Sequence, residues 1–198
     1  MLILILGAAA SGKSELAESV CLGLAGKEPS APALLYVAAM RPEGEEAERR
    51  IRRHRELRRG KGFETIEAYT DPAGRVGSHM QAGSLKKSIV LLECLSNLAA
   101  NCLFSEEGKL RDPDRIEREI RENLQQLSEA AGHLVLVGSD VFSDGILYPA
   151  ETESYRRVLA ALQQWAAKRA DLVIESVCGV PLCLKGSLSW FMGNGEEA

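Results

Sequence analysis

A short segment near the N-terminus, bounded by two glycines, restricts the fold more than any other feature of this sequence. Residues 7–14 match the pattern GxxxxGK[ST], in which the glycines allow a tight turn and bring backbone N–H groups close to phosphate oxygens. An apolar run precedes the segment and a helical pattern follows it, as phosphate binding at a helix N-terminus requires. We therefore expect a phosphate-binding loop that consists of Gly7, Ala8, Ala9, Ala10, Ser11, Gly12, Lys13 and Ser14.

The last two residues of this loop suit distinct chemical roles. The Lys13 ammonium would meet the β- and γ-phosphates of a nucleoside triphosphate, and the Ser14 hydroxyl would bind Mg²⁺. A carboxylate is also expected at the end of a neighbouring strand, and Glu93 follows the apolar run Ser88 to Leu92. We predict a metal site at Ser14 and Glu93, with the alternative that Glu93 only caps the next helix. Asp140 is a second carboxylate expected at the same edge of the sheet.

Apolar runs of strand length alternate with helical patterns, which is typical of an α/β fold with a mainly parallel sheet covered by helices on both faces. Asp112 and Pro113 are a plausible N-cap and first residue of one helix. The glycine-rich segment Thr70 to Lys87 is expected to be irregular. We predict one P-loop nucleotide-binding domain over residues 1–198. The expected strands are Leu2–Leu6, Leu34–Ala38, Ser88–Leu92, His133–Gly138, Leu172–Ser176 and Val180–Leu184, and the expected helices are Lys13–Leu24, Glu43–Arg59, Pro113–Ala131 and Glu151–Arg169.

Composition excludes several classes of protein. The net charge of −4 lacks the basic excess of a nucleic-acid-binding protein. The opening apolar run is too short to span a membrane and no basic segment precedes it, so we expect a cytoplasmic protein without a membrane span. The five cysteines form no CxxC pair, and we expect reduced, mostly buried thiols.

A basic segment with one histidine in its midst allows two interpretations. Seven arginines lie between residues 49 and 59, around His54, and four glutamates precede them. These charges could form a solvated helix face in which acidic and basic side chains pair. Alternatively, the arginines could bind a polyphosphate while His54 acts as nucleophile or as acid–base group. Nothing near His79 or His133 indicates more than a structural role.

The order of these motifs resembles the bifunctional adenosylcobinamide kinase/adenosylcobinamide-phosphate guanylyltransferase family of cobalamin biosynthesis. The specific element is the pattern RIxxHRxxR after a phosphate-binding loop, here Arg50 to Arg58. The resemblance extends over nearly the whole chain. It also includes Leu35–Met40, Phe63–Glu67, Leu91–Leu95 with Asn101, Leu134–Asp140, Gly145–Pro149, and Ala170–Val173 with Gly179.

The resemblance implies a RecA-like fold, a trimer with sites between subunits, and two reactions. In the first, ATP or GTP phosphorylates adenosylcobinamide, with Mg²⁺ at the loop. In the second, His54 attacks the α-phosphorus of GTP, and the resulting GMP–histidine passes GMP to adenosylcobinamide phosphate. The catalytic residues implied are His54 and Lys13. Besides the phosphate-binding loop, the nucleotide contacts implied are Ala38, Ala39, Met40, Arg55, Glu56, Leu57, Arg58, Glu67 and Glu93.

Some positions depart from the family pattern. Ala39 and Met40 stand where Thr-Ser is usual, Gly60 replaces a proline, residues 139–145 replace an Asn-Glu-Val-Gly type turn, and Ala160 and Gln163 replace Gly and Asn. Two other functions therefore stay open. One is a P-loop kinase of another small molecule that forms no covalent intermediate. The other is a catalytically degenerate GTP-binding regulator.

Overall fold

Seven strands form one sheet in the computed structural model, which describes residues 1–80, 83–105 and 107–188. The order is β3-β2-β4-β5-β1-β6-β7, and every neighbouring pair is parallel except β6 and β7. Because β1 lies between β5 and β6, the segment that follows it leaves the sheet from the middle of its carboxyl edge. The strands are β1 (Leu2–Leu6), β2 (Ala33–Ala38), β3 (Phe63–Glu67), β4 (Ser88–Glu93), β5 (His133–Val137), β6 (Leu172–Val177) and β7 (Val180–Lys185).

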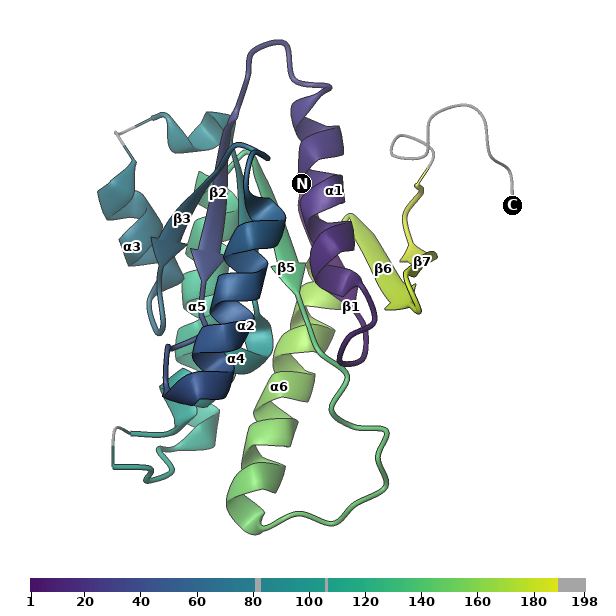
Figure 1. Ribbon diagram of the computed structural model, residues 1–198. Coiled ribbons are helices and arrows are strands. Elements are labelled where there is room, and N and C mark those ends of the chain that lie inside the picture. The colour runs from purple at the N-terminus through teal and green to yellow at the C-terminus, as the bar shows by residue number, and fades with distance from the viewer. Residues whose placement is uncertain (81–82, 106, 189–198) are drawn as a thin grey trace.

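Helices cover both faces of this sheet (Figure 1). Side chains alternate along β1, so Ile3 and Ile5 pack against α1 (Lys13–Ala25), whereas Leu2 and Leu4 belong to the core on the other face. That second core is closed by α3 (Pro72–His79), α4 (Leu95–Leu103), α5 (Pro113–Ala130) and α6 (Ala150–Arg169). A 3-10 turn, η1 (Leu85–Lys87), precedes β4, and α2 (Gly44–Arg58) lies on the same side as α1.

The α/β fold with a mainly parallel sheet is confirmed. Six strands and four helices occupy the predicted positions, and no end differs by more than one residue. At the start of α5 the Asp112 carboxylate accepts hydrogen bonds from the N–H groups of Asp114 and Arg115, and Pro113 is the first helical residue. This capping is why the predicted helix start is correct.

The prediction that Thr70 to Lys87 is irregular is wrong, because α3 and η1 lie in this segment. Asp71 caps α3 by accepting from the Gly74 N–H at 3.0 Å, and Pro72 supplies a preset helical φ. Val76 is fully buried against the core. Capping and this burial offset the low helix propensity of the glycines. Strand β3 and helix α4 were also not among the predicted elements.

All five cysteines are free thiols, as expected. Three of them are buried, whereas Cys178 and Cys183 are exposed. Among the helices of residues 1–80, 83–105 and 107–188, none is long and apolar enough to cross a membrane.

Candidate nucleotide-binding site

The loop between β1 and α1 has the backbone geometry that its two glycines permit. A Cβ added at Gly7 would lie 2.4 Å from the Ser11 hydroxyl oxygen and 2.8 Å from the Ser176 carbonyl oxygen. Gly12 has a φ of +87°, and a Cβ there would lie 3.2 Å from the Gly179 Cα. Space thus excludes a side chain at Gly7, whereas at Gly12 the positive φ is what favours glycine and the contact with Gly179 would only be tight.

The β6–β7 hairpin clamps the middle of this loop. Its turn residues Cys178 and Gly179 both have positive φ, as a two-residue type I′ turn requires. The Ser176 hydroxyl and the Gly179 N–H donate to the carbonyl of Ser11, at 2.7 and 2.9 Å. The loop is thus held from a part of the chain that no local sequence motif would indicate.

The Lys13 side chain folds back over the phosphate-binding loop. Its Nζ donates to the Ala8 carbonyl at 2.8 Å. Burial lowers the pKa of Lys13 from its ordinary value, Glu93 partly opposes this shift, and Arg50 of α2 adds to it.

Glu93 lies beside the loop at the carboxyl end of β4. The Ser14 hydroxyl donates a hydrogen bond to Glu93 Oε1, so the two predicted metal ligands are in direct contact. Glu93 is not the cap of α4, because Cys94 occupies that position. Within the described ranges, no three His, Cys, Asp or Glu side chains gather as a metal site on their own. The pair of oxygens fits Mg²⁺, which usually takes one or two protein ligands and completes its coordination with phosphates and water.

Three predicted nucleotide contacts lie in one row across neighbouring strands. The register pairs Ala38 with Glu67 of β3 on one side and with Glu93 on the other. Ala39 is fully buried, and its N–H donates to the Glu93 carbonyl at 3.0 Å. The Asn101 side chain fixes this turn by donating to the carbonyls of Ala39 at 2.7 Å and Tyr69 at 3.0 Å.

Helix α2 carries His54 and the arginines, and it is attached mainly at its C-terminal end. Arg58 is the one buried residue of the helix, and its guanidinium lies 3.4 Å from the centre of the Tyr36 ring. Arg55 pairs with Glu67 at 3.0 Å. His54 is partly buried, one turn from both Arg50 and Arg58 on the same face. The neighbouring predicted contacts Glu56 and Leu57 are exposed.

The acidic and basic residues of α2 pair less than a solvated ion-pair face would. Glu48 and Arg52 form the i,i+4 pair found within the helix, at 3.3 Å. A cavity of about 610 Å³ lies between the end of α2 and β3, lined by Arg55, Arg58, Arg59, Gly60, Gly62, Phe63 and Thr65. Another cavity, of about 330 Å³, lies around Met1 and Asp171 at the amino edge of the sheet and contains none of the predicted residues.

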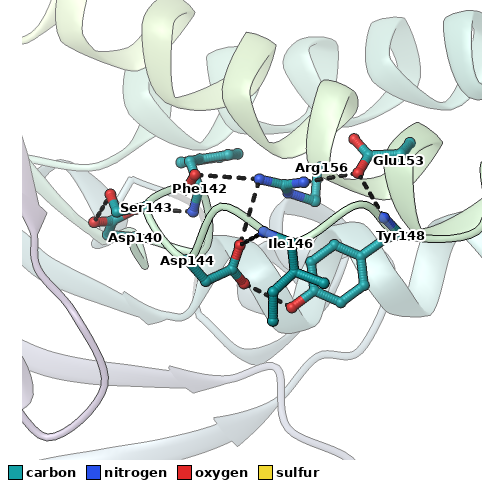
Figure 2. A network of polar contacts seen from close by, with 8 residues as sticks. All are labelled: Asp140, Phe142, Ser143, Asp144, Ile146, Tyr148, Glu153 and Arg156. Carbon is teal, nitrogen blue, oxygen red and sulfur yellow. Dashed lines mark hydrogen bonds and ion pairs between the residues drawn. The ribbon is translucent and has the colours of Figure 1, made fainter.

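Asp140 reaches the expected edge, but its carboxylate is used locally. Its N–H donates to the Gly7 carbonyl at 3.0 Å. Its side chain accepts from the Phe142 N–H at 2.9 Å and the Ser143 hydroxyl at 2.7 Å, and these bonds lower the pKa of Asp140. Figure 2 shows this turn beside the polar contacts of Arg156, whose guanidinium donates to the Phe142 carbonyl at 3.2 Å. The expectation that Asp140 lies at this edge of the sheet is therefore confirmed, and its carboxylate also closes its own turn.

Sequence reasoning did not predict the roles of three residues that shape the site. These are Tyr36, Ser176, and Asn101 with its bonds to the carbonyls of Ala39 and Tyr69. A signal existed for Tyr36, because it is the one side chain of β2 that carries a polar group. The other two act across long separations and left no local signal. His79 and His133 pair with Glu64 at 2.7 Å and Glu28 at 3.1 Å, which agrees with the structural roles expected for them.

Comparisons with known proteins found relatives that match most of this chain. Residues 3–184 match the family described as Cobinamide kinase / cobinamide phosphate guanyltransferase. The chain is 31% identical over 183 residues to the bifunctional adenosylcobalamin biosynthesis protein CobP of Pseudomonas aeruginosa, which covers 92% of this chain and 96% of that protein. It is also 28% identical over 194 residues to CobU of Salmonella typhimurium, and this match covers 93% of this chain and 100% of that protein. A solved KaiC-like protein of Pyrococcus horikoshii has a TM-score of 0.49 at 13% identity, with 87% of this chain and 69% of that chain covered. The protein belongs to the cobinamide kinase and cobinamide phosphate guanyltransferase family.

Proposed function

We propose that this protein phosphorylates adenosylcobinamide and then transfers GMP to adenosylcobinamide phosphate through a covalent GMP–His54 intermediate. The observation that carries the proposal is the juxtaposition of two segments. Ser14 of the loop and Tyr36 both hydrogen-bond Glu93, and the Tyr36 ring lies 3.4 Å from the guanidinium of Arg58, one turn from His54 on the same helix. A triphosphate bound at the loop would therefore face the histidine helix.

In the guanylyl transfer, a ring nitrogen of His54 attacks the α-phosphorus of GTP. The P–N bond forms while the bond to the bridging α–β oxygen breaks, and pyrophosphate leaves. A phosphate oxygen of the cobinamide phosphate then attacks the same phosphorus, which forms a P–O–P bond and frees His54. The arginines of α2 suit the charge that accumulates on pyrophosphate, because a guanidinium binds two phosphate oxygens at once.

In the kinase reaction, the aminopropanol hydroxyl of the cobinamide attacks the γ-phosphorus of ATP or GTP, and the nucleoside diphosphate leaves. Lys13 and the backbone N–H groups of residues 7–14 hold the phosphates. Ser14 and Glu93 would hold Mg²⁺, which neutralises charge on the phosphates when it is bound. We further infer that the protein is a homo-oligomer, a trimer by its family, which sedimentation equilibrium would test.

The decisive experiment uses GTP labelled at the α-phosphate. The wild-type protein is expected to acquire label that is acid-labile and base-stable, as a phosphoramidate is. His54→Ala should acquire none. His79→Ala is the matched control, because His79 is also partly exposed but pairs with Glu64 away from the loop, and it should be labelled like the wild type.

Three other outcomes would redirect the assignment. Equal labelling of His54→Ala and wild type would refute the covalent intermediate at this residue. Transfer from the γ-phosphate alone, with no protein-bound label, would favour a P-loop kinase of a small molecule. Tight GTP binding with no turnover on any cobinamide, and a partner protein recovered on pulldown, would favour the regulator.

A further inference from the structure

Helix α2 has little to fix its position except its last turn. Every residue of the helix other than Arg58 is exposed or only partly buried. The apolar residues Ile51 and Leu57 are not buried, and Leu57 is 52% exposed. A helix that buries so little apolar surface depends on a few specific contacts for its placement. The position of His54 therefore depends on what holds Arg58.

A continuous series of contacts joins Arg58 to the phosphate-binding loop. The Ser14 hydroxyl donates to Glu93 Oε1, and the Tyr36 hydroxyl donates to Glu93 Oε2 at 3.3 Å. The Tyr36 ring lies under the Arg58 guanidinium. Arg58 in turn donates to the His54 carbonyl at 3.2 Å. Glu93 thus has one carboxylate oxygen toward the loop and the other toward the helix.

Tyr36 is well suited to connect these groups. It is 5% exposed, so both its hydroxyl and its ring are shielded from water. Its hydroxyl is the donor in the bond to Glu93, because an ionised carboxylate can only accept. Arginine over a shielded aromatic face is a favourable pairing that depends on the planar ring.

We propose that Tyr36 and Arg58 are positioning residues that couple the metal-binding end of the phosphate-binding loop to the helix that carries His54. A ligand that competes for the Ser14 hydroxyl or the Glu93 carboxylate changes the hydrogen bond at Tyr36, and the last turn of α2 responds. The role of His54 in this account rests on the proposed function, whereas the physical coupling does not.

Hydrogen exchange tests the coupling without any reaction. Amide exchange in residues 50–59 is measured in the full chain, without ligand and with Mg²⁺ plus a GTP analogue that has a methylene group between the α- and β-phosphorus. In the wild type, the ligand is expected to change exchange in this segment. Arg58→Ala should speed ligand-free exchange there by about fivefold, the factor for one net hydrogen bond. Exchange in α5 reports whether a variant stays folded.

Tyr36→Phe separates the two halves of the proposed link. It keeps the ring under Arg58, so ligand-free exchange should stay within about twofold of wild type, but the response to ligand should fall by half or more. Tyr148→Phe is the control, because Tyr148 also combines a phenol–carboxylate hydrogen bond, to Asp144 at 2.6 Å, with an arginine over its ring, Arg156 at 5.2 Å. A full ligand response in Tyr36→Phe, no response in wild type, or unchanged exchange in Arg58→Ala would each overturn the proposal.

Labelling from α-labelled GTP adds a functional measurement. Tyr36→Phe is expected to slow single-turnover labelling about fivefold at saturating GTP, because one hydrogen bond that positions the nucleophile is lost. The GTP concentration for half-maximal labelling should change less than twofold. If the wild type acquires no label, the proposed function fails, while the exchange data still decide the coupling.

Discussion

One prediction concerns the ion pair that joins the turn after α2 to helix α1. Lys61 Nζ lies 2.6 Å from Glu18 Oε2. The Glu18 side chain is 3% exposed and that of Lys61 is 30% exposed. Replacing Lys61 by Met leaves the nearly fully buried carboxylate of Glu18 without its partner.

The size of the effect follows from this asymmetric burial. Breaking a fully buried ion pair typically costs about 3–5 kcal/mol. Because water reaches the Lys61 end, we expect about 2–3 kcal/mol for Lys61→Met. For a chain of this size, that loss corresponds to a Tm lower by about 5–10 °C. Replacing both partners, Glu18→Leu with Lys61→Met, removes the unpaired charge and should cost less than about 1 kcal/mol.

The assay is equilibrium unfolding in urea for the wild type, the two single variants and the double variant. The expected signature is a double variant that is more stable than Lys61→Met alone. A surface substitution typically changes the free energy of unfolding by no more than about 0.5 kcal/mol. If Lys61→Met changes it by no more than this, the ion pair does not contribute to stability and the effect expected from burial is wrong. Losses that simply add in the double variant would equally refute a direct interaction.

Three further predictions concern other parts of the structure. Gly7→Ala should abolish GTP binding in calorimetry, because its Cβ would meet Ser11 and Ser176, whereas Gly77→Ala, with nothing within 4 Å, should bind like wild type; near-normal binding by Gly7→Ala would contradict this geometry. Burial raises the pKa of Cys102 from 9.0 to about 11 and that of Tyr155 from 10.0 to about 12. As the pH rises, these two groups ionise in the unfolded chain before they do so in the folded protein. Their effect on the free energy of unfolding is therefore absent below about pH 9, and this free energy falls as the pH rises toward 12. Urea midpoints should fall over this range, and less steeply in Tyr155→Phe. Arg156→Ala should speed chymotrypsin cleavage within residues 140–149 at least about fivefold, the value of one hydrogen bond, while unchanged cleavage would mean that the Asp140 turn alone holds this loop.

Most of the sheet could be predicted because its strands are buried on both faces and are therefore apolar throughout. Strand β3 could not, because it is an edge strand in which Ile66 is the one buried residue. Helix α4 could not either, since Cys94 caps it without a side-chain bond and gives no start signal. Local burial and capping thus determine which elements a sequence reveals.

The candidate site divides in the same way. The phosphate-binding loop could be predicted because its chemistry depends on adjacent residues. The contact of Ser176 with Ser11 could not, because the two residues are 165 positions apart. The place of Asp140 at this edge could be predicted from the strand before it, whereas the bonds of its carboxylate to Phe142 and Ser143 could not, because they depend on the conformation of the following turn.

The position of β1 in the sheet has a consequence for how the chain acquires its structure during synthesis. Strand β1 is made before β5 and β6, with which it pairs, and the loop that follows it is clamped by the β6–β7 hairpin. Its partners are translated much later, since Leu2 of β1 pairs with Leu134 of β5. Until then the N-terminal segment is an unpaired apolar strand, which exposes a nascent chain to aggregation. The protein should therefore become able to bind nucleotide only late in its synthesis. A truncated chain that ends before residue 179 should not bind nucleotide, even though every residue of the phosphate-binding loop remains.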